Sequence, residues 1–220
     1  MDNNNEKTLE ELQRQSGIMK KKLTVILISV LGAVALILGT ATVVSILKNN
    51  KKPDFEYDDS YFYPTYQGDI MTYSDYLDLD RTVSYCADPS GQGMTTSIDE
   101  TNEAEFDASV LFLRDYINVV ISGDEQAYNA LFNETYYKKN KPQAPFTPQM
   151  IYRTKITYRT EETDGDDRLV AYWLEYMIFE NDGTFRRDIA SNASRRQNVV
   201  LRISADGSIR IEELTTVFIQ

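Results

Sequence analysis

Two pairs of arginines are the side chains in this sequence with the clearest capacity to bind an anion or an acidic partner. Arg186 and Arg187 precede a short predicted loop, and Arg195 and Arg196 lie at its other end. A guanidinium binds a carboxylate or phosphate through two parallel hydrogen bonds, so clustered arginines favour an anion-facing or protein-facing patch. A solvated sheet face is the simpler alternative, and the sequence leaves both interpretations open.

The region from residue 48 to 101 carries the opposite charge. Its carboxylates far outnumber its basic residues, and many tyrosines are interleaved with them. Prolines and glycines interrupt the region, and neither the helical nor the strand period persists, which predicts an acidic, tyrosine-rich linker. Disordered spacers are usually poor in aromatic residues. A second hypothesis is therefore that residues 54 to 80 dock on the arginine pairs, within one chain or between subunits.

A set of large aromatic side chains could line a pocket between helices and sheet. Its members fall on predicted helices and strands: Tyr128, Phe132, Tyr152, Trp173 and Tyr176. Small-ligand pockets are lined by such residues, but large aromatics at alternating strand positions are also typical of a filled core. Both interpretations stay open at these positions.

The composition excludes the common catalytic sets. The chain has no histidine and one cysteine, Cys86, which rules out Ser-His-Asp and Cys-His machinery, histidine-built zinc sites and an intramolecular disulfide. Lys and Arg total 23 against 34 Asp and Glu, a net charge of −11, and no basic stretch suits nucleic acid. We therefore predict no catalytic residue, no cofactor, no metal site and no nucleic-acid partner.

Residues 23 to 47 form an apolar run without a charged residue. As a helix, a run of this length spans a bilayer. A cleaved signal peptide is the alternative, but its apolar core is typically only about 7 to 15 residues long. The lysines and arginines before the run predict a cytoplasmic tail over residues 1 to 22, with the remainder outside. The sequence thus predicts an integral, single-span protein of the cell membrane.

Helical periodicity begins after residue 102. Apolar residues at helical spacing predict a first helix that ends at Ser122-Gly123, and Asp124 is a cap for a second helix that continues to about Lys141. Thr147 followed by a proline predicts a short third helix from Pro148 to about Arg153.

After residue 156 the period changes to two, which is typical of strands. Turn sequences at Asp164-Gly165, Asn181 to Gly183 and Ala205 to Gly207 separate the alternating stretches, and residues 184 to 189 are one of the predicted strands. The predicted fold class is α+β: three helices packed on a curved antiparallel sheet of four or five strands, over residues 102 to 220.

This order of elements resembles the nuclear-transport-factor-two-like, cystatin-like cone fold. The resemblance lies in the segment from Gly123-Asp124 to Tyr128-Asn129 and Leu131-Phe132, followed by the hairpins that ENDG and SADG close. With the tail and the single span, the layout is also similar to bitopic scaffold subunits of type IV secretion machines and other envelope assembly proteins of Gram-positive bacteria. The resemblance brings no catalytic motif with it.

These observations predict a non-enzymatic, single-pass envelope protein. Its outer domain is expected to act as a protein-interaction or assembly module, with a protein partner or a second copy of the chain. The alternative is a small-ligand-binding protein or an enzyme of the same cone fold, in which the aromatic residues would line a pocket.

Overall fold

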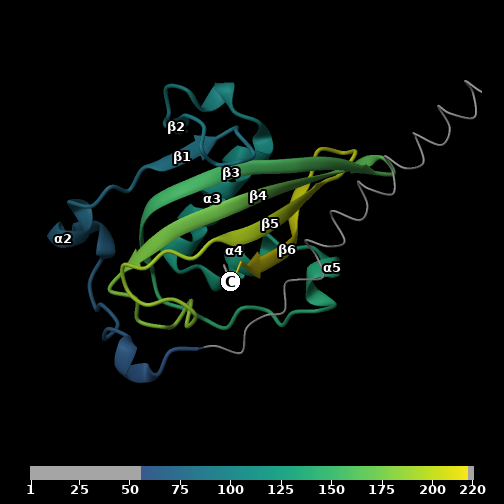
Figure 1. The fold of residues 1–220 in the computed structure, drawn as a ribbon. Helices are drawn as coiled ribbons and strands as arrows, with labels where there is room; N and C mark the ends of the chain where they lie inside the picture. The colour runs from purple at the N-terminus through teal and green to yellow at the C-terminus, as the bar shows by residue number, and fades with distance from the viewer. Residues whose placement is uncertain (1–55, 218–220) are drawn as a thin grey trace, which may run out of the picture. The chain divides into compact units, whose positions relative to one another are not determined.

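A six-stranded sheet is the framework of residues 56 to 217, the part of the chain that the structure, a computed structural model, describes (Figure 1). The spatial order is β2-β1-β3-β4-β5-β6. The bounds are β1 (Val83–Cys86), β2 (Thr95–Ser97), β3 (Met150–Asp164), β4 (Asp167–Phe179), β5 (Gln197–Ile203) and β6 (Ile209–Thr216). The sheet is mixed, because β1 runs parallel to β3 and every other neighbouring pair is antiparallel.

The two long strands β3 and β4 form a hairpin whose turn is set by its sequence. Gly165 adopts a φ of 64°, a left-handed conformation that glycine tolerates best. Along β4, every second residue is buried, from Val170 to Ile178, while the residues between them are partly exposed. This period of two gives the sheet one apolar face and one more polar face.

The longest helix, α3, packs on the apolar face, and the remaining helices are short. The bounds of the helices are η1 (Asp59–Tyr61), η2 (Ile70–Thr72), α2 (Ser74–Leu77), η3 (Glu103–Glu105), α3 (Ala108–Ser122), α4 (Glu125–Ala130) and α5 (Glu134–Tyr137). The Asp107 carboxylate accepts a hydrogen bond from the Ser109 N–H at the start of α3, and Gly123 ends the helix with a φ of 70°. Figure 1 shows α3 behind β3 and β4.

The core lies between α3 and the sheet. Leu113 and Val120 of α3 are fully buried, as are Ile156, Leu174 and Leu201 of the strands. Burying a side chain of this size contributes about 1.5 to 3 kcal/mol, so this layer is the main source of stability. The α3 helix therefore fixes which face of the sheet remains available to partners.

A segment that we call the strap, residues 56 to 73, runs beside the loop after β4. The Tyr57 N–H donates to the Arg187 carbonyl and the Tyr63 N–H to the Asn181 carbonyl, both at 2.9 Å. Both segments lie together at the lower left of Figure 1. The ring of Phe62 packs against Gly183, where an added Cβ would lie 2.8 Å from the ring.

The predicted antiparallel sheet of four or five strands, preceded by a linker, is wrong. The sheet has six strands and is mixed, because residues 83 to 97, assigned to the linker, form β1 and β2. The described part of that region also contains the strap, which includes η2, and the helix α2. Tyr76 of α2 is only 1% exposed. These short elements are stabilised by contacts with the rest of the domain, which a local pattern does not reveal.

The predicted helices and strands also differ in detail. The predicted third helix is the start of β3, where Met150, Ile151 and Tyr152 pair with β4. The predicted second helix divides into α4 and α5, because the Asn133 side chain caps a new helix there. Residues 184 to 189 form a loop and not a strand. The α+β class and the end of the first predicted helix agree with the structure.

The predicted tail, residues 1 to 22, and the predicted membrane span, residues 23 to 47, lie outside the described residues. Within residues 56 to 217, no helix has the length and apolar character needed to cross a membrane.

Candidate interaction face

The face of the sheet opposite α3, which we call the outer face, carries a row of aligned residues at its centre. Trp173 of β4 pairs with Thr157 of β3 on one side and with Asn198 of β5 on the other. Their sequence neighbours Ile156 and Leu174 are in the core, so these three side chains belong to the outer face.

Two guanidinium groups pack on the indole of Trp173. The Cζ of Arg159 lies 3.4 Å from the ring centroid and that of Arg196 lies 3.9 Å from it. Arg159 follows Thr157 by two residues, whereas Arg196 precedes Asn198 by two. Because β3 and β5 run in the same direction, the backbones of the two arginines lie on opposite sides of Trp173 along the strands, and both guanidinium groups contact its indole.

A β-bulge positions Arg159. In the register of β3 and β4, Tyr158 pairs with Tyr172 and Thr160 with Ala171, so Arg159 is the extra residue of β3. A bulge twists its strand and redirects a side chain, and bulges are common near functional sites. The bulge therefore places a cation over Trp173 that the regular alternation would have set beside Ala171.

Positive charge exceeds negative charge at this stack. Glu175 forms an ion pair with Arg196 at 3.4 Å, with both side chains 28% exposed. Within residues 56 to 217, the Arg159 side chain has no hydrogen bond or ion pair, and its charged group contacts the Trp173 indole. Burial lowers the pKa of Arg159, and the neighbouring charge of Arg196 lowers it further. A carboxylate placed here would relieve both unfavourable effects.

The residues around Trp173 also contain buried polar atoms without a partner in the described part of the chain. They are Thr157 Oγ1, Asn198 Nδ2 and Arg196 Nε, and Thr157 and Asn198 are 1% and 4% exposed. An unsatisfied buried polar group costs about 1 to 3 kcal/mol, so such groups are rarely kept in a purely structural position. Their gathering around one indole marks the place as a candidate binding site.

The outer face continues to a polar hollow at its β2 end. There Ser97 pairs with Ser84, which pairs with Lys155. These residues line a shallow cleft of about 280 Å³, with Asp80 and Arg153 at its rim. The Lys155 ammonium donates to the Gly91 carbonyl at 2.8 Å, so this lysine holds the β1–β2 loop over the face.

The structure separates the four arginines that the sequence places in one patch. Arg186 is 6% exposed and pairs with Asp188 inside the domain. Arg187 contacts the strap through Asp59, at 2.5 Å, and Glu56, at 3.4 Å. Arg196 joins the Trp173 stack with Arg195 immediately before it. Glu56 and Asp59 of the acidic region therefore meet the loop after β4 within one chain, through Arg187.

Four of the five aromatic residues considered for a pocket are buried, and Tyr128 and Phe132 pack against each other. Tyr128 is 5% exposed, and its ring centroid lies 5.0 Å from that of Phe132. Tyr176 is fully buried and its hydroxyl accepts a hydrogen bond from Arg186 at 3.3 Å. The Tyr152 hydroxyl bonds to Asn192, and Trp173 lies on the outer face. The structure therefore does not bring the five together around one hollow.

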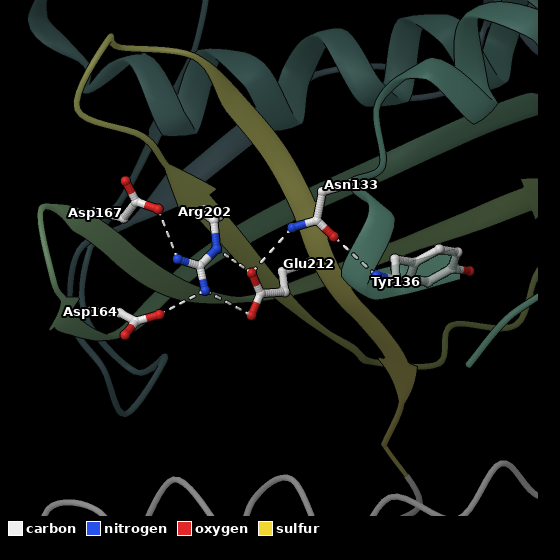
Figure 2. Close-up of polar contacts among 6 residues, drawn as sticks. All are labelled: Asn133, Tyr136, Asp164, Asp167, Arg202 and Glu212. Carbon is white, nitrogen blue, oxygen red and sulfur yellow. Dashed lines mark hydrogen bonds and ion pairs between the residues drawn. The ribbon is translucent and has the colours of Figure 1, made fainter. Parts of the chain in front are cut away.

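A second cluster of charged residues, centred on Arg202, has a structural role. Figure 2 shows Arg202 of β5 bonded to three carboxylates: Asp164 and Asp167 at the β3–β4 turn, and Glu212 of β6. Glu212 also accepts from Asn133, whose own side-chain oxygen caps α5 at Tyr136. All the donors that face this cluster are engaged, so it ties the hairpin, β6 and α5 together.

No protein-family model, curated protein or solved structure matches this chain. The resemblance to the cone fold therefore stays a prediction. Sequence analysis did not identify Arg159, because its role depends on a bulge and on the register of three strands. The available signal was the alternation of Thr157 and Arg159 opposite a tryptophan, which became meaningful only once the strands were paired.

Proposed function

We propose that this domain is a non-catalytic protein-interaction module that binds acidic protein segments on its outer face. The observation that carries the proposal is the stack of Arg159, Trp173 and Arg196, in which two cations share one indole and, among residues 56 to 217, only Arg196 has a carboxylate partner. Tryptophan and arginine are the residues most often found at the energetic centre of protein interfaces.

The expected ligand is a carboxylate on a protein chain. A carboxylate accepts two parallel hydrogen bonds from a guanidinium, and a neighbouring aromatic ring would pack against the indole. The protein as a whole is acidic, with a net charge of −11, so this local excess of positive charge distinguishes the face from its surroundings. Opposite charge gives such a contact its selectivity and its rate of association.

The alternative of a small-ligand pocket or an enzyme has less support. Tyr128, one of the residues proposed to line a pocket, is surrounded by other aromatic rings, as its T-shaped pairs with Phe146 and Phe185 illustrate. The envelope location expected from residues 23 to 47 remains a sequence prediction, and the proposed binding activity does not depend on it.

The fluorescence of Trp173 tests the proposal directly, because the chain contains one tryptophan. An acidic, tyrosine-containing peptide is titrated into the full-length protein, beside a control peptide with each Asp and Glu replaced by its amide. We expect the acidic peptide alone to change the emission, with affinity falling as salt rises. Arg159→Ser should weaken the binding about tenfold or more, as for the loss of a charged interface hot spot. Equal responses to both peptides would contradict the proposal.

A further inference from the structure

We infer that the strap of one copy of the chain binds the outer face of a second copy, so that the protein assembles head to tail. This inference rests on the proposed function, since it names the acidic segment that the outer face would receive. Two surfaces of the same domain carry the argument: the strap, which is acidic and has exposed tyrosines, and the outer face, where two arginines pack on the partly buried Trp173.

The strap has the composition of an interface. The large apolar side chains that are exposed in the described part of the chain come mainly from it: Tyr61 58%, Tyr63 48%, Tyr66 38% and Met71 50%. Tyrosine and methionine are enriched in protein interfaces relative to other surfaces. An exposed aromatic cluster of this kind marks an interaction surface more often than a solvated one.

The charge of the strap complements the outer face. The strap contains Glu56, Asp58, Asp59 and Asp69 and no basic residue. Asp58 and Asp69 accept backbone hydrogen bonds from residues two positions later, yet each carboxylate retains capacity for a guanidinium. On the outer face, Arg159 supplies a guanidinium without a carboxylate partner among the described residues.

The strap is held on its own domain by a different set of contacts. Phe62 packs on Gly183, the Thr65 hydroxyl donates to Asp182 at 3.0 Å, and the Tyr73 hydroxyl donates to Glu180 at 3.2 Å. These contacts order the strap before any partner binds, which reduces the conformational entropy lost on association. Tyr61 and Tyr63 remain exposed in this ordered segment.

A contact between two different surfaces of one chain has a geometric consequence. It is heterologous: each copy offers its strap to one neighbour and its outer face to another, so the assembly is a ring or an open chain. Exposed ion pairs alone are weak, and burial of the tyrosines against Trp173 must supply much of the affinity. We therefore expect association that weakens by about tenfold or more between low and high salt.

Sedimentation velocity of the full-length protein, at low and high salt, tests the inference with two variants. The face variant combines Arg159→Ser with Arg196→Ser, and the strap variant combines Tyr61→Ser with Tyr63→Ser. The wild type should associate with rising concentration, and each variant alone should not. An equimolar mixture should form dimers and nothing larger. The intact strap of the face variant can bind the intact outer face of the strap variant, and no second contact is possible. Leu77→Ser, at a residue of α2 that is 37% exposed and lies outside the strap and the outer face, is the matched control and should associate like the wild type.

The results separate this inference from the proposed function. A wild type that stays monomeric at low salt overturns the inference, as does association that survives in both variants or a mixture that gives no dimer. If the acidic peptide still changes the Trp173 emission in that case, the outer face binds acidic segments of another protein and the proposed function stands. If the peptide has no effect either, both are overturned. Circular dichroism of each variant checks that its fold is retained.

Discussion

The Asp188 carboxylate lies 2.6 Å from the Arg186 guanidinium, at a position where the arginine side chain is only 6% exposed. Burial by itself would lower the pKa of Arg186, but Tyr176 and Asp188 raise it on balance. The ion pair is therefore an internal element of the fold, and the loop after β4 depends on it.

We expect Asp188→Asn to destabilise the domain by about 3 to 5 kcal/mol, because it leaves a buried guanidinium without its counter-charge. Urea denaturation monitored by Trp173 fluorescence measures the effect. The double variant Arg186→Met with Asp188→Asn removes the buried charge as well, so it should be more stable than Asp188→Asn alone. If the double variant is the less stable of the two, the pair does not act through charge burial.

Stability should fall in acid. Burial alone would raise the pKa of Asp182 and Asp188, but hydrogen bonds from Thr147 and Thr184 to the first, and Arg186 beside the second, lower both values below 3.8. A carboxyl with a lowered pKa in the folded state stabilises the fold above its unfolded pKa, and that contribution is lost as pH falls through the folded value.

The urea midpoint should therefore change little between pH 7 and pH 5 and fall steeply below about pH 4, near the unfolded carboxyl value. Asp188→Asn should reduce the steepness, because one of the responsible groups no longer titrates. If the urea midpoint of Asp188→Asn falls with pH as steeply as that of the wild type, other carboxyls cause the acid sensitivity.

Gly183 tests how the strap is held. Its φ is 73°, and an added Cβ would lie 2.8 Å from the Phe62 ring, so Gly183→Ala combines backbone strain with a clash against the strap. Gly207 has a φ of 84° with no atom within 4 Å of an added Cβ, which makes Gly207→Ala a control for strain alone.

We expect both glycine variants to lose about 1 kcal/mol or more through backbone strain. Only Gly183→Ala should also release the strap, which limited proteolysis reports as faster cleavage near Tyr61 and Tyr63. Equal cleavage rates in the two variants would show that Phe62 does not anchor the strap at this position.

Tyr128 tests the packing of the aromatic core. It is 5% exposed and contacts Phe132, Phe146 and Phe185 with centroid distances of 5.0, 5.7 and 5.4 Å. Tyr128→Ala should cost about 3 to 5 kcal/mol, as for other large aromatic truncations in a close-packed core. Tyr128→Phe retains the ring and should cost much less. A small loss for Tyr128→Ala would favour a natural pocket at this place.

Local patterns in the sequence predicted the elements that are defined by their own residues. The first helix ends at Gly123 because a left-handed glycine stops a helix, and the β3–β4 hairpin turns at Asp164-Gly165. These signals are local, and the structure agrees with them.

Elements that depend on distant partners could not be predicted in this way. β1 has four residues and is a strand because β3 lies beside it, in a parallel register that pairs Val83 with Thr154. The strap region and the loop that carries the two arginine pairs have opposite charges, and the sequence therefore predicted a contact between them. Tertiary structure decided that Arg187 makes that contact, whereas Arg186 is buried with Asp188.

The sequence by itself determined the acidic charge, the absence of histidine-based chemistry and the α+β class, because composition and periodicity do not depend on how the chain folds back on itself. Only the tertiary structure decided the candidate binding site. Arg159 and Trp173 lie on β3 and β4, and Arg196 immediately precedes β5, so a shift of one residue in either register would move one of them to the other face of the sheet. Strand register is set by the summed packing of the whole core, so no short stretch of sequence specifies it.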